Sequence, residues 1–150
     1  MRSKRTIAVL SASLLVMVLA NNGVSTAQAP LPKPVLVFLG QEPYEANGKS
    51  WTRYRYAVAN AHAYPNALFA AAPKLPPCGK NLKAARTWVD VYEQSGKRLY
   101  GFCALGSGND LGKLWFALER DVIPPSWVYV EMRDRQTGLK YKSNLAETTL

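Results

Sequence analysis

The chain has 150 residues, of which 48% are hydrophobic and 19% charged, and its formal net charge at neutral pH is +9. This composition excludes a disordered tail, a collagen and a cysteine-dense mini-protein. All ten prolines and every aromatic residue lie from Pro30 onward. We therefore expect the folded part of the chain to begin after residue 29.

Residues 1–29 have the pattern of a secretory signal peptide. Basic residues within the first five positions precede an apolar run, Ile7 to Ala20, which is shorter than the roughly 20 residues that span a bilayer. The tripeptide Ala27-Gln28-Ala29 has the small-x-small pattern that signal peptidases cleave. The sequence therefore predicts an exported protein of the bacterial periplasm or exterior, with no stable membrane span after cleavage. Retention of the segment as an anchor is the alternative.

The two cysteines of an exported chain usually form a disulfide. Cys78 lies in a proline-rich loop and Cys103 in an apolar run. The chain-entropy model gives about 3.5 kcal/mol of stabilisation for a bond that closes a loop of this length. We predict a Cys78–Cys103 disulfide, and a reactive thiol is the alternative.

The first half of the mature chain begins with prolines that favour an extended leader over residues 30–34. Alternating apolar and polar residues predict strands over 35–41 and 52–60, with a turn-bearing loop over 43–50 between them. In the second strand, Tyr54, Tyr56 and Val58 point to one face, and Arg53 and Arg55 to the other. Residues 61–83 are the least regular, and we expect a short edge strand at 68–70.

The second half alternates more clearly. It predicts strands over 86–92, 98–105, 113–119, 127–133 and 139–143, with turns at 94–97, 106–110 and 134–138. Residues 146–150 are expected to form a frayed tail. The sequence thus predicts one all-β domain over 35–145.

About seven short strands separated by turns are typical of an antiparallel β-sandwich. A small closed β-barrel is the alternative, because periodicity alone does not distinguish the two. Residues 124–130, with Gly138 and Ser143 beyond them, resemble the closing strands of a fibronectin type III or immunoglobulin-like module. Residues 52–60 are similar to the second strand of these modules, and the mature chain resembles small exported bacterial proteins. The resemblance implies a binding or spacing role rather than catalysis, although the predicted disulfide departs from the pattern of these families.

Residues for catalysis and metal binding are few. His62 is the only histidine, and no serine stands near it in a pattern that indicates a nucleophile and its base. One histidine and two cysteines do not supply a zinc site, and the turn at Asn109-Asp110 lacks the carboxylates of a calcium loop. Gly106, Gly108 and Gly112 precede a predicted strand, whereas a dinucleotide-binding loop opens a helix. The sequence predicts no metal and no cofactor.

Basic and aromatic residues on outward positions are the candidate binding residues. Arg53 and Arg55 share one outer face, and Lys140 and Lys142 share another. Rings alternate with aliphatic residues at Trp88, Trp115, Trp127 and Tyr129. If the aliphatic residues fill the core, some of these rings are exposed beside cations, an arrangement that suits an anionic polymer, a glycan or a protein partner. Alternatively, the rings belong to the core and the lysines maintain solubility.

The favoured function is a non-catalytic interaction module that binds an envelope protein or an anionic surface polymer. The alternatives are a small secreted hydrolase that uses His62 and a structural protein of the cell envelope. Nucleic acid is not an expected partner, because export separates the chain from it. In addition, alternation sends the arginines and tyrosines of residues 53–56 to opposite faces.

Overall fold

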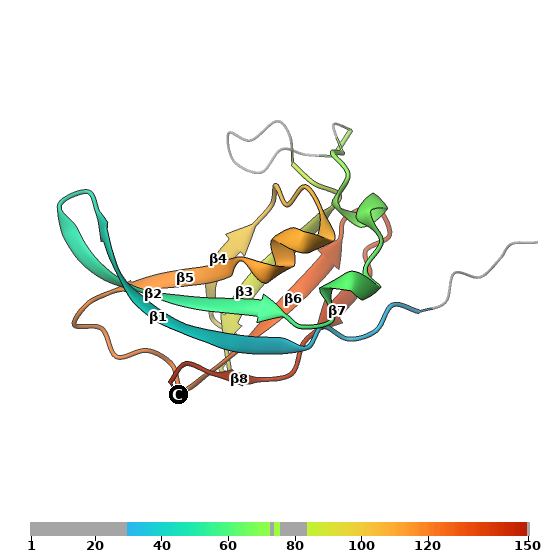
Figure 1. Cartoon of the computed structure of the whole chain (residues 1–150). Helices are drawn as coiled ribbons and strands as arrows, with labels where there is room; N and C mark the ends of the chain where they lie inside the picture. Colours follow the sequence, from blue (N-terminus) through green and yellow to red (C-terminus); the bar gives the residue numbers. More distant parts are fainter. Residues whose placement is uncertain (1–29, 73, 76–83, 150) are drawn as a thin grey trace, which may run out of the picture.

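The computed structural model describes residues 30–72, 74–75 and 84–149, which form eight strands (Figure 1). The strands are β1 (Leu36–Ala46), β2 (Lys49–Val58), β3 (Thr87–Glu93), β4 (Arg98–Phe102), β5 (Leu114–Glu119), β6 (Trp127–Asp134), β7 (Lys140–Lys142) and β8 (Ala146–Glu147). Three short 3-10 helices are η1 (Ala61–Ala63), η2 (Asn66–Phe69) and η3 (Gly108–Gly112). No helix among the described residues has the length and apolar character needed to cross a membrane.

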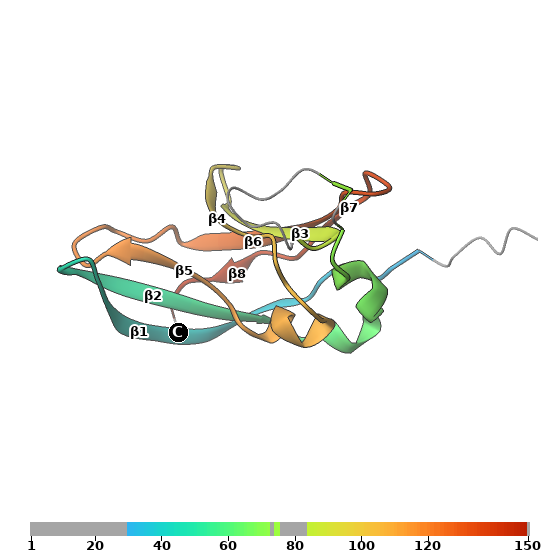
Figure 2. The ribbon, with the colours of Figure 1, turned by 90° about the horizontal axis from the view of Figure 1, so that it is seen from above.

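The strands form two antiparallel sheets that pack against each other as layers (Figure 2). The first sheet has the order β1-β2-β5, and the second has the order β4-β3-β6-β7, with β8 also pairing with β6. The predicted all-β sandwich is therefore confirmed, and the two sheets do not close into one small barrel.

The core lies between the sheets and is built by the alternation of the strands. Tyr54, Tyr56 and Val58 of β2 are buried as predicted, and the ring of Tyr54 stacks on Phe116 of β5 at a centroid distance of 5.0 Å. The second sheet contributes aliphatic side chains, of which Val89, Val91, Val128, Val130 and Met132 are at most 1% exposed. Burial of such side chains stabilises the fold by roughly 1.5–3 kcal/mol each.

The β1–β2 hairpin is longer than the sequence indicated. The predicted loop over 43–50 is wrong, because β1 continues to Ala46 and only Asn47 and Gly48 form the turn. Their φ angles of 53° and 71° are those of a two-residue type I′ turn. Pro43 is tolerated in β1 because β1 is an edge strand. The tip of this hairpin projects beyond the rest of the sandwich (Figure 1).

Two further expectations from the sequence are corrected. The segment expected to form an edge strand at 68–70 instead lies largely in η2, which follows Pro65 and buries Leu68 and Phe69. Within the expected frayed tail, Ala146–Glu147 form β8, because Ala146 packs into the core and the buried Thr148 donates its hydroxyl to the carbonyl of Pro125. Pairing with β6 and a hydrogen bond from the Thr148 N–H to the Ser126 carbonyl at 3.2 Å also hold this short segment.

The predicted leader is extended and is fastened to the domain by side chains. The Asn60 side chain accepts a hydrogen bond from the Val35 N–H at 2.9 Å and donates one to the carbonyl of Lys33 at 2.9 Å. The Tyr64 hydroxyl donates to the carbonyl of Pro32 at 2.7 Å, and burial raises the pKa of Tyr64 to about 12. These bonds fix the leader beside η1.

The predicted disulfide stays a prediction. Cys103 follows β4 directly and is partly buried, while Cys78 lies outside the described residues.

Candidate binding site

The predicted binding residues separate onto two opposite outer faces. Arg53 and Arg55 of β2 and Trp115 of β5 lie on the outer face of the first sheet. The outer face of the second sheet carries Trp88, Tyr129, Lys140 and Lys142, with Trp127 at the start of β6. The structure therefore does not bring all of the predicted residues together.

On the outer face of the second sheet, charged groups pair with one another. Asp90, which is 8% exposed, accepts a hydrogen bond from Arg98 at 2.7 Å. Glu131 lies 3.2 Å from the ammonium of Lys140 and 3.5 Å from the guanidinium of Arg133. Each carboxylate on this face is thus neutralised by a neighbouring strand of the same sheet.

The rings on this second face are covered as well. The Lys142 ammonium lies 3.8 Å from the centroid of Tyr129, which also stacks on Tyr92 at 5.2 Å and is only 9% exposed. The Arg135 guanidinium lies 3.8 Å from the centroid of Trp88. Tyr129 is therefore not one of the exposed rings, because Lys142 and Tyr92 cover it.

On the outer face of the first sheet, one carboxylate serves two arginines. Glu42 of β1 is the cross-strand partner of Arg53, and its two oxygens lie 3.1 Å from Arg53 and 3.3 Å from Arg55. The Arg53 guanidinium is also held between two rings, at 4.0 Å from the centroid of Tyr44 and 4.9 Å from that of Trp115. Arg53 is consequently fixed, whereas the side chain of Arg55 is 52% exposed.

The ring of Trp115 on this face packs against other aromatic rings and is not freely exposed. Its ring lies 4.7 Å from Tyr100 and 6.3 Å from Phe102, both on β4, and 6.1 Å from Tyr44 on the β1–β2 hairpin. Trp115 is therefore only partly exposed. Its packing against rings from β1 and β4 fixes the position of Arg53 above it.

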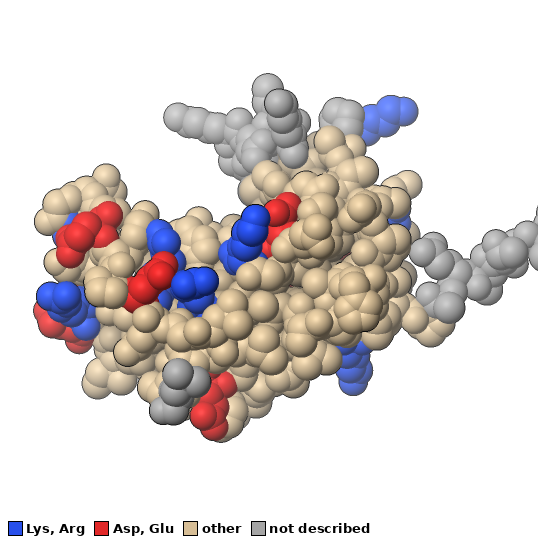
Figure 3. All heavy atoms as spheres, in the orientation of Figure 1, with Lys and Arg blue, Asp and Glu red and all other residues tan. Residues whose placement is uncertain are grey.

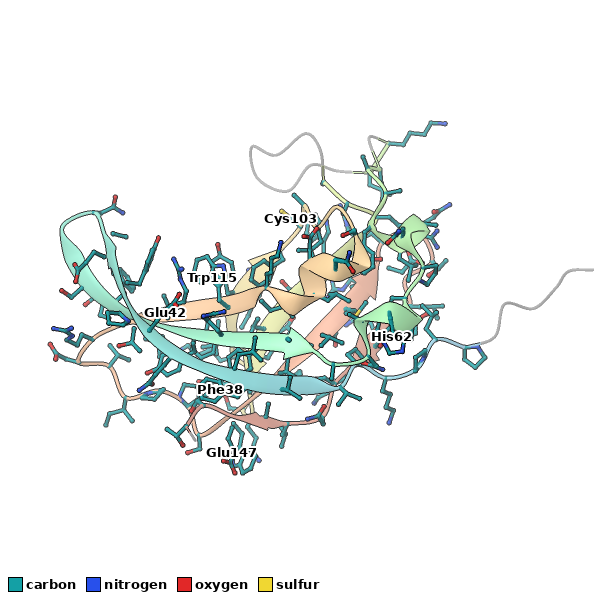
Figure 4. All side chains as sticks on the ribbon, viewed as in Figure 1. Phe38, Glu42, His62, Cys103, Trp115 and Glu147 are labelled. Atoms are coloured by element: carbon teal, nitrogen blue, oxygen red, sulfur yellow. The ribbon has the colours of Figure 1, made fainter. Side chains whose placement is uncertain are left out.

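These side chains surround a hollow of about 310 Å³, which we call the cationic hollow. It is lined by Leu39, Glu42, Arg53, Arg55, Tyr56, Gly112, Lys113, Leu114 and Trp115. Figure 3 shows basic and acidic side chains gathered over the β1–β2 hairpin and the adjoining part of the first sheet. In Figure 4, Glu42 and Trp115 lie over the same part of this sheet.

The cationic hollow has more positive than negative charge. Arg53, Arg55 and Lys113 line it, and Glu42 is the single carboxylate among the lining residues. An arginine carries five N–H donors, so one carboxylate leaves donors of both arginines available. Within the part of the chain that the structure describes, Lys113 is in no ion pair. The arrangement is suited to bind an anionic group.

Sequence reasoning identified three of the lining residues and missed the others. Glu42 stood between the strand expected over 35–41 and the loop expected over 43–50, and Lys113 stood at the start of a predicted strand. Tyr44, which contacts Arg53, fell inside the predicted loop. The hairpin signal at Asn47-Gly48 was the available clue, because a two-residue turn places Glu42 beside Arg53.

His62 lies apart from the cationic hollow. It is an exposed residue of η1, and Figure 4 shows it at the opposite end of the first sheet from Glu42 and Trp115. Among the described residues no hydrogen bond or ion pair joins His62 to a serine or a carboxylate, and no group of three metal-binding side chains is found.

No family model matches the sequence, and no curated protein or solved structure has significant similarity to it.

Proposed function

We propose that this protein is a non-catalytic binding module that binds an anionic polymer on the outer face of the first sheet. The observation that carries the proposal is the cationic hollow, in which two arginines and a lysine surround a single carboxylate. Carboxylate, phosphate and sulfate groups form charge-assisted hydrogen bonds with such guanidinium and ammonium donors. An acidic envelope protein is the alternative partner.

The shape of the site supports a polymer rather than a small enclosed ligand. Arg55 and Lys113 are exposed, and Leu39 at the rim of the hollow is 49% exposed. A repeating anionic chain can therefore place one charged group at the hollow and continue along the β1–β2 hairpin. Weak contacts at successive repeats then add through effective concentration.

The proposal includes export of the chain and a fibronectin type III or immunoglobulin-like character of the sandwich. Export places the binding face where surface polymers occur, and a two-sheet scaffold of this kind suits binding or spacing. An intact mass measured without reduction tests the processing. The expected product begins at Pro30 and is about two daltons lighter than the dithiol form, as a Cys78–Cys103 bond requires.

Binding is tested by chromatography of the exported chain on an immobilised sulfated polysaccharide. The variant Arg55→Gln/Lys113→Gln removes two positive charges from the cationic hollow, and Lys140→Gln/Lys142→Gln removes two from the opposite face. Because the net charge is the same in both variants, a difference between them reports the location of binding. We expect elution at distinctly lower salt for the first variant only.

Equal loss in the two variants would show that net charge alone causes retention. Retention that does not change with salt would remove the electrostatic basis of the proposal. A purified acidic protein domain applied in place of the polysaccharide, if it alone distinguishes the variants, would assign the face to a protein partner instead.

A further inference from the structure

A second basic surface lies between the leader and β7, away from the cationic hollow. It is an open groove of about 790 Å³, here called the lysine groove. The groove is lined by Leu31, Lys33, Pro34, Val35, Lys140, Tyr141, Lys142, Ser143 and Asn144. We infer that it binds an extended acidic segment of another protein, which adds as a strand to the free edge of β7.

The main chain of β7 has groups available for such pairing. The Ser143 N–H donates to the Val130 carbonyl at 2.9 Å, and the Asp134 N–H donates to the Leu139 carbonyl at 2.9 Å. Because hydrogen-bonded and non-hydrogen-bonded pairs alternate in an antiparallel ladder, the N–H and C=O groups of Lys140 and Lys142 point away from β6. Among the described strands, none other than β6 pairs with β7.

Beside the lysine groove, a side-chain amide already forms peptide-like hydrogen bonds with β1. The Asn144 side chain accepts a hydrogen bond from the Leu36 N–H at 2.8 Å and donates one to the Leu36 carbonyl at 3.0 Å. A carboxamide that accepts and donates in this way occupies the place of a peptide unit beside β1. A peptide-like group is thus already accommodated beside β1 by Asn144, which also lines the groove.

The lysines that line the groove indicate an acidic partner. Lys140 shares Glu131 with Arg133, whereas Lys33 and Lys142 are in no ion pair within the described residues. Lys140 and Lys142 project from the same face of β7, two residues apart, so alternate carboxylates on an added strand would oppose them. A second copy pairing through β7 would instead place lysines opposite lysines, which is how edge strands resist self-association.

Strand addition obtains affinity from main-chain hydrogen bonds and specificity from alternate side chains. This inference does not depend on the proposed function, because the lysine groove and the cationic hollow belong to different sheets. The two can therefore fail separately.

The test uses a capped, fluorescently labelled heptapeptide in which glutamate alternates with threonine, and the exported chain with each variant. We expect Lys140→Gln/Lys142→Gln to weaken binding about three- to tenfold, through the loss of two exposed ion pairs. Arg55→Gln/Lys113→Gln, with the same net charge, should bind the peptide as the parent chain does. A peptide with lysine in place of glutamate should not bind.

A second pair of variants separates strand addition from simple attraction between charges. Lys142→Gln and Lys142→Pro both remove the charge, but only proline also removes the outward N–H. Since this N–H is not bonded to β6, proline leaves the ladder intact, as Pro43 does in β1. Unfolding curves check this point. We expect Lys142→Pro to bind about two- to tenfold more weakly than Lys142→Gln, and the bound peptide to slow hydrogen exchange at the Lys140 and Lys142 amides.

Three results would overturn the inference. The first is equal binding by Lys142→Pro and Lys142→Gln together with unchanged exchange at both amides. The second is full competition by a sulfated polysaccharide. Because this polymer has no peptide groups, such competition would identify a general anion site. The third is loss of peptide binding in Arg55→Gln/Lys113→Gln, which would move the peptide to the cationic hollow.

Discussion

The two outer faces of the sandwich carry similar residues but differ in how their cations are paired with carboxylates and aromatic rings. On the second sheet, Asp90 and Glu131 neutralise the cations of neighbouring strands, and lysine and arginine cover the rings of Tyr129 and Trp88. On the first sheet, Glu42 is shared by two arginines, and Lys113 stands beside them. If the first sheet is the binding face, as proposed, it is distinguished by one carboxylate among three cations rather than by a larger number of cations.

The largest expected effect concerns the most buried carboxylate of each sheet. Asp134, which is 2% exposed, accepts hydrogen bonds from Arg86 at 2.8 and 2.6 Å and from Thr137 at 2.7 Å. Asp134→Ala leaves Arg86 without its partner and should lower the free energy of unfolding by about 3 kcal/mol or more. Glu42→Ala, at a partly exposed pair, should cost at most about 1 kcal/mol. Denaturant unfolding of both variants measures the difference, and similar losses would contradict the contrast between the two sheets.

The pH dependence of stability follows from the same carboxylate. Hydrogen bonding from Arg86 holds the pKa of the Asp134 carboxyl well below its usual range. Because the folded pKa is lower than the unfolded one, about 3.9, the stabilisation is complete above that pH and is lost as the pH falls further. The gap in unfolding free energy between the parent chain and Asp134→Asn should therefore narrow steadily below about pH 4. A gap that stays constant down to pH 2 would exclude this ion pair as its source.

Two glycines provide the next contrast. A side chain at Gly101 would occupy the space through which the Arg98 guanidinium reaches Asp90, whereas Gly112 beside the cationic hollow has open space around it. We expect Gly101→Ala to destabilise the fold by about 1–2 kcal/mol, since it displaces one partner of a buried carboxylate. Gly112→Ala should change stability by at most about 0.5 kcal/mol. Thermal unfolding of both variants tests this, and equal shifts would contradict it.

The smallest expected effect concerns Arg53. Its planar guanidinium lies between Tyr44 and Trp115, an arrangement that an ammonium group does not reproduce. Arg53→Lys should cost about 0.5–1 kcal/mol of stability and lower the salt at which the chain leaves the polysaccharide column. Lys142→Arg, which keeps a cation over Tyr129, should change neither. An Arg53→Lys chain that behaves like its parent would show that the geometry at this position is unimportant.

Alternation along the strands was sufficient to predict the sandwich, because the residues of each buried face recur at every second position of the local sequence. Tyr54, Tyr56 and Val58 were assigned to the core on that basis. Alternation does not reveal which outward rings are covered, because cover comes from residues distant in sequence: Lys142 lies over Tyr129, and Tyr100 lies against Trp115. The role of Glu42 was missed because the type I′ turn extends β1 past Pro43, a residue that usually marks the end of a strand.

The four tryptophans allow the most direct test of where the anionic polymer binds. Each gives one indole N–H signal in a ¹H–¹⁵N spectrum, and Trp115 and Trp88 lie on opposite outer faces. Titration with a short sulfated oligosaccharide should shift the Trp115 signal in a saturable and salt-dependent manner while the Trp88 signal stays in place. A saturable shift at Trp88 with none at Trp115 would contradict the assignment of binding to the first sheet.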